Sequence, residues 1–131
     1  QLRGLFISGT DTGVGKTALT SVLLAAARSC GGNWIAAKPV QTGVHPCTSP
    51  RRRPLGDLAL AARAAGWHPP LEWLEHLQPY VLPSPSSPHR AAELAGQRID
   101  LVRILRGLRI VGRAADGLLV EGAGGLLVPL N

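Results

Sequence analysis

Residues 9–17, which read GTDTGVGKT, form a glycine-rich segment that could bind phosphate. The segment follows the apolar run GLFI and precedes ALTSVLLAAA, so it lies between an expected strand and an expected helix. Glycines let successive backbone N–H groups point at phosphate oxygens, and the positive end of the helix adds to the attraction. Lys16 can reach the outer phosphates, and the Thr17 hydroxyl can bind Mg²⁺. The spacing is unusual, because five residues separate Gly9 from Gly15 where four are common.

Lys38 is the only other lysine, although 14 residues of the chain are Lys or Arg. It follows the apolar segment WIAA and opens the sequence KPVQTG. Lysine offers a compact point charge to phosphate or carboxylate, where arginine offers a bulky planar fork. A surface lysine at a strand end is the alternative, but Pro39 and the small pair Thr42–Gly43 favour a site. We therefore expect Lys38 to face a second anionic group.

Two acidic residues are candidates for holding the metal ion that accompanies a nucleotide phosphate. Glu121 ends the apolar run GLLV before a glycine-rich turn, a position that holds the metal in other P-loop enzymes. Asp57 opens an Ala/Leu-rich helix, where capping of the helix is the alternative role. Asp11 either assists the metal or makes only a hydrogen bond within its own turn. His45 and His89 have no second metal ligand at a useful spacing, so zinc is not expected.

The elements that must position these residues follow an α/β pattern. Apolar runs predict buried strands at 4–8, 34–37 and 117–121. Helices are expected over 16–28, 57–65, 72–77 and, capped by Asp100, 101–111. The proline-rich segment 79–89 predicts turns without regular structure.

The order strand, helix, strand over the first 37 residues predicts a βαβ unit, with a parallel pair and a right-handed crossover. Ligands of open parallel sheets bind at the carboxyl ends of the strands. The three expected strands end in GTDTGVGKT, KPVQTG and EGAGG, so all the candidate residues should meet at one edge. Three strands make a narrow sheet, and we expect the domain to be a fragment of a longer one.

Length and composition favour one domain, residues 1–131, that binds neither a membrane nor nucleic acid. The chain is 45% hydrophobic and 17% charged, which argues against disorder, and its apolar stretches are too short to span a membrane. The net charge is +6, but the arginine triplet 51–53 lies in a proline-rich loop without interleaved aromatic residues. The N-terminus leaves no room for a signal peptide, and two cysteines make no disulfide framework. We expect a cytoplasmic protein.

Five motifs in order resemble those of the dethiobiotin synthetases of biotin biosynthesis. The family's phosphate loop has the form GTDTxVGKT, and the five-residue spacing between the glycines here resembles the spacing in that loop. KPVQTG, GDLALA and SPSSPH, which begin at residues 38, 56 and 84, resemble three further family segments, and VEGAGGLLVPL, from residue 120, resembles the acidic-glycine segment. The resemblance covers the whole chain.

This resemblance implies a P-loop NTPase-like α/β fold, a parallel sheet with helices on both faces, of which the chain is the N-terminal portion. It implies an enzyme that uses ATP and Mg²⁺ to carboxylate and cyclise 7,8-diaminononanoate with CO₂, through a carbamate and a carbamic-phosphoric anhydride, and that forms a homodimer. The implied catalytic residues are Lys38 and Lys16, and Thr12 and Thr42 would contact the diamine. The implied metal ligands are Thr17, Asp57 and Glu121. The implied ATP-binding residues are Gly13, Val14, Gly15, Lys16, Thr17, Ala18, Asp57, Glu121, Gly122, Ala123 and Gly124.

Two alternatives remain open at this stage. A ParA/MinD-like switch ATPase shares the plan of three strand ends, but such proteins usually carry a lysine inside the glycine loop, and residues 9–14 contain none. An inactive fragment that retains only phosphate binding is the other alternative, because base recognition and much of the subunit interface lie further along the family's chain. Some family members also carry Glu where Gly13 stands, which argues against an acidic role at that position.

Overall fold

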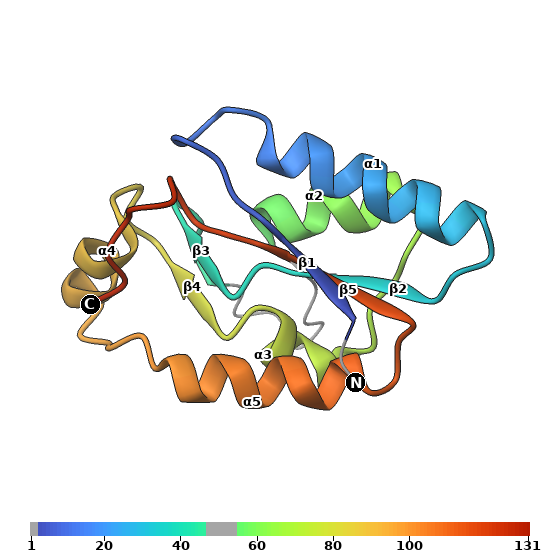
Figure 1. Cartoon of the computed structure of the whole chain (residues 1–131). Coiled ribbons are helices and arrows are strands. Elements are labelled where there is room, and N and C mark those ends of the chain that lie inside the picture. The colour runs from blue at the N-terminus through green and yellow to red at the C-terminus, as the bar shows by residue number, and fades with distance from the viewer. Residues whose placement is uncertain (1–2, 47–54) are drawn as a thin grey trace.

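A computed structural model of the chain describes residues 3–46 and 55–131. Its centre is a three-stranded parallel sheet made of β1 (Gly4–Ile7), β2 (Trp34–Ala37) and β5 (Gly117–Glu121) (Figure 1). These are the three strands expected from the apolar runs, so that prediction is confirmed. Cys30 is free and exposed, whereas Cys47 and the arginine triplet 51–53 lie outside the described residues.

The strand order is β1-β5-β2, so the predicted pairing of β1 with β2 is wrong. Strand β5 lies between them and pairs in parallel with both, Ile7 opposite Glu121 and Ala37 opposite Val120. The connection from β1 through α1 to β2 leaves one strand position between them, which β5 fills, and the local sequence does not encode this vacant position. Leu118 and Leu119 of the central strand β5 are 2% and 1% exposed, and Ile35 and Ala36 of β2 are equally buried, so burial separates β5 from β1 but not from β2.

A second, two-stranded parallel sheet joins β3 (Val40–Thr42) to β4 (Tyr80–Leu82). The expectation that 79–89 has no regular structure is therefore wrong. Prolines flank β4 rather than interrupt it, and its residues Tyr80 and Leu82 are buried against the core. Pro88 then occupies the first turn of helix α4 (Pro88–Leu94), where its missing N–H costs nothing.

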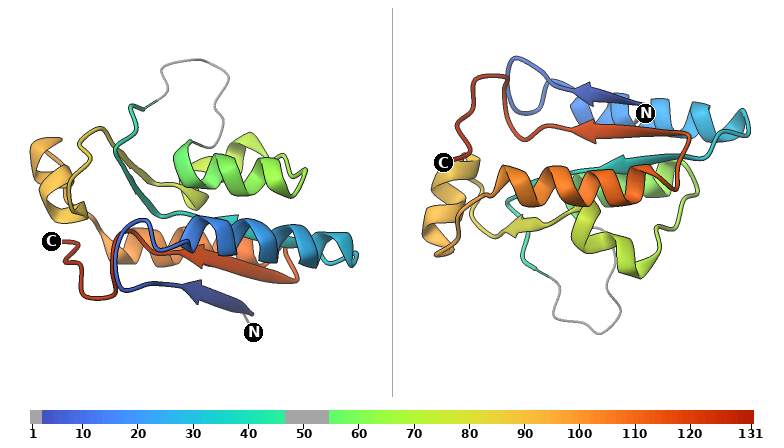
Figure 2. Two further views of the ribbon diagram at one scale, coloured as in Figure 1. Left: turned by 90° about the horizontal axis from the view of Figure 1, so that it is seen from above. Right: turned by 60° about the horizontal axis from the view of Figure 1, so that its bottom comes forward.

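Helices lie on both faces of the central sheet, as predicted. Helices α1 (Lys16–Ser29) and α2 (Gly56–Ala64) pack together on one side, and α3 (Leu74–Leu77) and α5 (Leu101–Gly112) lie on the other (Figures 1 and 2). A short 3₁₀ helix, η1 (Leu71–Trp73), precedes α3. Asp100 caps α5 as expected, because its Oδ1 accepts the Val102 N–H at 2.8 Å.

The two sides of the sheet are covered unequally. On the α5 side, an apolar groove of about 830 Å³ lies between that helix and strands β1 and β5. Leu5 and Phe6 of β1 are 52% and 66% exposed, in keeping with the place of β1 at the edge of the sheet. None of the helices in the described part of the chain combines the length and apolarity that a membrane crossing requires.

Candidate active site

The glycine loop connects β1 to α1 and places Lys16 at the first residue of the helix. Gly13 and Gly15 have φ of +76° and +103°, in the left-handed region that other residues adopt only with strain. Gly15 is the N-cap of α1 and has no side chain that could accept a hydrogen bond from the first amides of the helix. The first amides of α1 are thus available to an anion.

Lys16 is 8% exposed, and its Nζ donates a hydrogen bond to the Asp11 carbonyl oxygen within the same loop. The Asp11 carboxylate accepts the Thr12 N–H at 2.7 Å. Asp11 therefore acts on the turn that contains it, which is one of the two roles that its sequence position left open. The loop is held in a curved conformation by its own backbone and by these two contacts.

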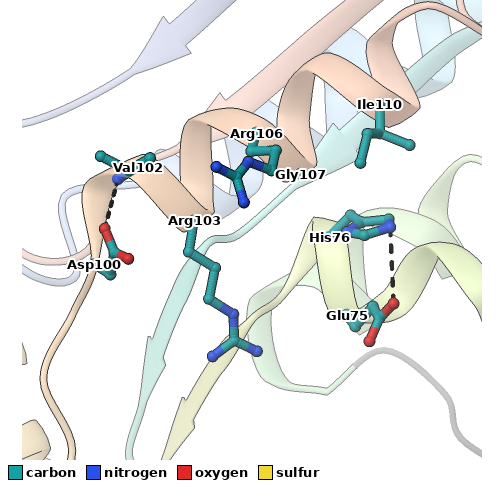
Figure 3. Close-up of a pocket in the computed structure, with 8 residues that line it drawn as sticks. All are labelled: Glu75, His76, Asp100, Val102, Arg103, Arg106, Gly107 and Ile110. Atoms are coloured by element: carbon teal, nitrogen blue, oxygen red, sulfur yellow. Dashed lines mark hydrogen bonds and ion pairs between the residues drawn. The ribbon is translucent and has the colours of Figure 1, made fainter.

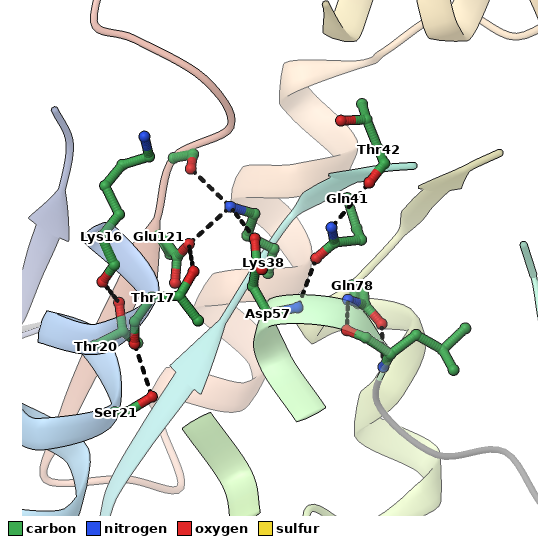
Figure 4. Close-up of polar contacts among 12 residues, drawn as sticks. Lys16, Thr17, Thr20, Ser21, Lys38, Gln41, Thr42, Asp57, Gln78 and Glu121 are labelled. Carbon is green, nitrogen blue, oxygen red and sulfur yellow. Dashed lines mark hydrogen bonds and ion pairs between the residues drawn. The ribbon is translucent and has the colours of Figure 1, made fainter. Parts of the chain in front are cut away.

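Lys38 lies at the centre of a buried polar cluster (Figure 4). Its Nζ lies 2.8 Å from Glu121 Oε1 and 2.9 Å from Asp57 Oδ2, and it donates to the Gly122 carbonyl oxygen at 2.9 Å. Lys38 and Glu121 are only 4% and 2% exposed. Lys38 was expected to face a second anionic group of a ligand, whereas its partners in the structure are the two predicted carboxylates, so its role toward a ligand stays a prediction.

Thr17 joins this cluster from the glycine loop, because its hydroxyl donates to Glu121 Oε1 at 2.8 Å. The cluster therefore collects residues from α1, from the end of β2, from α2 and from the end of β5. Asp57 and Glu121 contact one lysine nitrogen, and Thr17 joins them through Glu121, although the three were predicted separately along the sequence. Convergence of the strand ends at one edge of the sheet accounts for this meeting.

The donor set of the cluster fits Mg²⁺. Glu121, Asp57 and Thr17 offer only oxygen atoms, which hard divalent cations prefer. Both carboxylates contact the same nitrogen, so one small cation could reach both, and a single lysine offsets only one of their two negative charges. Among the described residues no three His, Cys, Asp or Glu side chains gather where they could hold a metal ion, so the cluster offers two carboxylates and the Thr17 hydroxyl.

The acidic-glycine segment packs directly against the glycine loop. Gly122 N–H donates to the Ile7 carbonyl oxygen at 2.9 Å, and Leu126 N–H donates to that of Gly9 at 3.0 Å. A Cβ at Gly125 would lie 2.6 Å from the Thr10 carbonyl oxygen, so only glycine permits this approach. The predicted ATP-binding residues Gly122, Ala123 and Gly124 therefore stand beside the start of the loop that contains Gly13, Val14 and Gly15, and Ala18 follows in the first turn of α1.

The two predicted substrate contacts lie on different loops. Thr12 is exposed in the glycine loop, and Thr42 is half-buried at the end of β3. No described hydrogen bond joins their side chains to the cluster around Lys38. Their proposed role stays a prediction.

Two buried glutamines beside the cluster escaped the sequence reasoning. Gln41 Oε1 accepts the Asp57 N–H at 3.0 Å, and Gln78 contacts both the N–H and the carbonyl oxygen of Leu55. Gln41 lies inside the KPVQTG motif, which could have drawn attention to it. Gln78 carried no comparable signal.

A second, smaller cavity of about 250 Å³ lies between α3 and α5, away from the strand ends (Figure 3). It is lined by exposed charged groups such as Arg103 and Arg106, and His76 Nε2 lies 3.8 Å from the exposed Glu75 carboxylate. The Arg103 guanidinium lies 5.1 Å from the centre of the Tyr80 ring. The polar lining therefore consists of charged side chains at the solvent-exposed contact between α3 and α5.

Comparison with known proteins gives the class to which this fold and site belong. A family model described as AAA domain matches residues 3–131, and the chain belongs to this family. Such domains bind nucleotide phosphates on a glycine loop like the one described above.

The similar proteins include several named ATP-dependent dethiobiotin synthetase BioD. The chain is 44% identical to that of Anaeromyxobacter sp. (strain Fw109-5) over 130 residues, which are 99% of this chain and 54% of the relative. It is 42% identical to that of Nitrosospira multiformis over 98% of this chain and 53% of the relative. For that of Serratia marcescens the identity is 40%, over 96% of this chain and 53% of the relative. The chain thus spans about half the length of the curated relatives it matches.

Proposed function

We propose that this chain carries the phosphate-binding and catalytic groups of an ATP-dependent dethiobiotin synthetase. The observation that carries the proposal is the buried lysine Lys38, held by two carboxylates at the same sheet edge as the phosphate loop. A nucleotide switch needs the loop and a metal site, but it does not need a second lysine there. The names of the similar proteins agree with this proposal.

ATP would bind with its phosphates on the amides of Gly13–Ala18 and against Glu121–Gly124. Lys16 would contact the outer phosphates in place of the Asp11 carbonyl oxygen, to which its Nζ now donates a hydrogen bond. Thr17, Asp57 and Glu121 would hold Mg²⁺, which supplies positive charge to the phosphates when bound. These roles fit the oxygen-rich cluster in Figure 4.

In the proposed reaction, an amine of 7,8-diaminononanoate forms an N–C bond with CO₂ and loses a proton, giving a carbamate. A carbamate oxygen then attacks the γ-phosphorus of ATP, ADP leaves, and a carbamic-phosphoric anhydride remains. The second amine attacks its carbonyl carbon and loses a proton, and phosphate leaves as the cyclic urea closes. Lys38 and Lys16 would stabilise the negative charge that moves between carbamate and phosphate, a form of preorganised electrostatic catalysis.

Thr12 and Thr42 would orient the diamine, and we propose that the enzyme works as a homodimer in the cytoplasm. A dimer would let a second subunit complete the diamine site.

Phosphate release from ATP, measured with and without 7,8-diaminononanoate and bicarbonate, tests the proposal. We expect release that requires the diamine and is lost in Lys38→Ala. Release that is indifferent to the diamine would instead indicate a switch ATPase. A folded chain that binds ATP and releases no phosphate would indicate that the remaining length of the relatives is needed for turnover.

A further inference from the structure

Gln41 makes two hydrogen bonds that link the end of β3 to the start of α2. It is 6% exposed, and its Oε1 accepts the Asp57 N–H at 3.0 Å while its Nε2 donates to the Thr42 carbonyl oxygen at 3.0 Å. Both partners are backbone atoms of residues predicted to belong to the site. A buried amide with both ends bonded has one well-defined orientation, since rotation would leave buried polar atoms without partners.

The first turn of α2 takes its side-chain acceptor from Gln41, because the N-cap residue of the helix has none. The N-cap is Leu55, whose side chain has no acceptor, although the first amides of a helix need one. Gln41 provides the acceptor from a strand 16 residues earlier in the chain. The position of the first turn of α2, and of Asp57 within it, is therefore set by β3.

Gly56 allows Gln41 to approach this closely. Gly56 has a φ of +55°, and a Cβ there would lie 2.5 Å from Gln41 Cδ and 2.6 Å from its Oε1. A side chain at position 56 would both strain the backbone and displace the glutamine. The helix start and the Gln41 amide thus fit together as a pair.

Gln78 also binds the start of α2, but at Leu55, the residue that precedes the helix. Its Oε1 accepts the Leu55 N–H at 3.1 Å and its Nε2 donates to the Leu55 carbonyl oxygen at 2.9 Å. Gln78 is also buried, at 8% exposure, but it bonds to neither Asp57 nor Thr42. It is a matched control for the loss of a buried amide.

We propose that Gln41 is a positioning residue, which ties the Thr42 backbone to the first turn of α2 and so fixes the Asp57 carboxylate beside Lys38. The inference builds on the proposed function, in which Asp57 helps to hold the metal ion. Groups that orient metal ligands without touching the metal commonly affect its affinity by one to two orders of magnitude. The effect should therefore appear in metal binding more strongly than in folding.

The test compares Gln41→Met with Gln78→Met in the 131-residue chain, using Mn²⁺ as the probe, with ADP present and free Mn²⁺ measured by electron paramagnetic resonance. We expect Gln41→Met to weaken Mn²⁺ binding about tenfold. Gln78→Met should weaken it less, although both variants lose two buried hydrogen bonds and should lose similar unfolding free energy. Equal weakening in the two variants, or unchanged affinity in Gln41→Met, would overturn the inference.

A second measurement separates this inference from the proposed function. Amide hydrogen exchange at Asp57 should accelerate roughly fivefold in Gln41→Met, because that N–H loses its acceptor. If the unaltered chain binds no Mn²⁺, the proposed function fails, and unchanged exchange at Asp57 would separately overturn the role of Gln41. Should Gln41→Met not fold, Gln41→Asn keeps the amide but is too short to reach both partners, and the same changes are expected.

Discussion

The glycine loop and the Lys38 cluster place two buried lysines at one sheet edge but satisfy them in different ways. In the described part of the chain, Lys16 Nζ makes a single hydrogen bond, to a backbone carbonyl of its own loop. Lys38 Nζ contacts two carboxylates and a carbonyl oxygen that come from two distant segments, the start of α2 and the end of β5. The loop thus holds groups ready for an incoming anion, while the cluster is an internally paired part of the fold. Lys38 should matter to stability as well as to activity, and Lys16 chiefly to binding.

Lys38→Met should produce the largest loss of stability. The change leaves the buried Glu121 carboxylate without its counter-charge, and breaking such a pair costs about 3 kcal/mol. Urea unfolding measures the loss. Mg²⁺ should reduce it, since the ion can supply positive charge to the same oxygens.

A double variant, Lys38→Met with Glu121→Gln, serves as the control and should recover much of the lost unfolding free energy. If the single variant is as stable as the original chain, the ion pairs around Lys38 do not contribute as described.

Lys16→Met should reverse this pattern. One hydrogen bond to a carbonyl is lost, so the unfolding free energy should fall by only about 1 kcal/mol. Affinity for ATP should fall roughly tenfold or more, because a charge-assisted contact with phosphate is removed. Calorimetric titration with Mg-ATP provides the measurement, and equal losses of stability in Lys16→Met and Lys38→Met would remove the distinction between the two regions.

Gly15→Ala tests whether the loop acts through its backbone conformation. The residue has a φ of +103°, and no atom lies within 4 Å of an added Cβ, so the cost is conformational and not steric. We expect a loss of about 1–2 kcal/mol in thermal unfolding, together with weaker ATP binding. Wild-type stability in this variant would mean that the loop relaxes to another conformation without cost.

Thr17→Val should lower the unfolding free energy by about 1 kcal/mol, no more than Lys16→Met, because it removes only the hydrogen bond to Glu121 Oε1. Thr17→Ser keeps the hydroxyl and is the matched control. Mn²⁺ binding in the presence of ADP should weaken in the valine variant and persist in the serine variant. If both behave alike, the hydroxyl does not link the loop to the cluster.

The parts of the fold that rest on local patterns were predictable. Apolar runs located β1, β2 and β5, and the phosphate loop was recognisable from the spacing of its glycines and Lys16. The pairing of β5 between β1 and β2 was not predictable, because strand order depends on which surfaces are buried together. Strand β4 was missed because flanking prolines mask three residues whose partner, β3, lies 40 positions earlier.

The candidate site divides in the same way. Residue type and position were enough to predict a site role for Lys16 from its place after the glycine loop, and for Lys38 and Glu121 from their places at the ends of buried strands. Which groups touch was decided by contacts between segments far apart in the chain: Lys38 with Asp57 and Glu121, and Gln41 with the start of α2. Hydrogen bonds act over about 3 Å, and only the packed chain brings such distant residues within that reach.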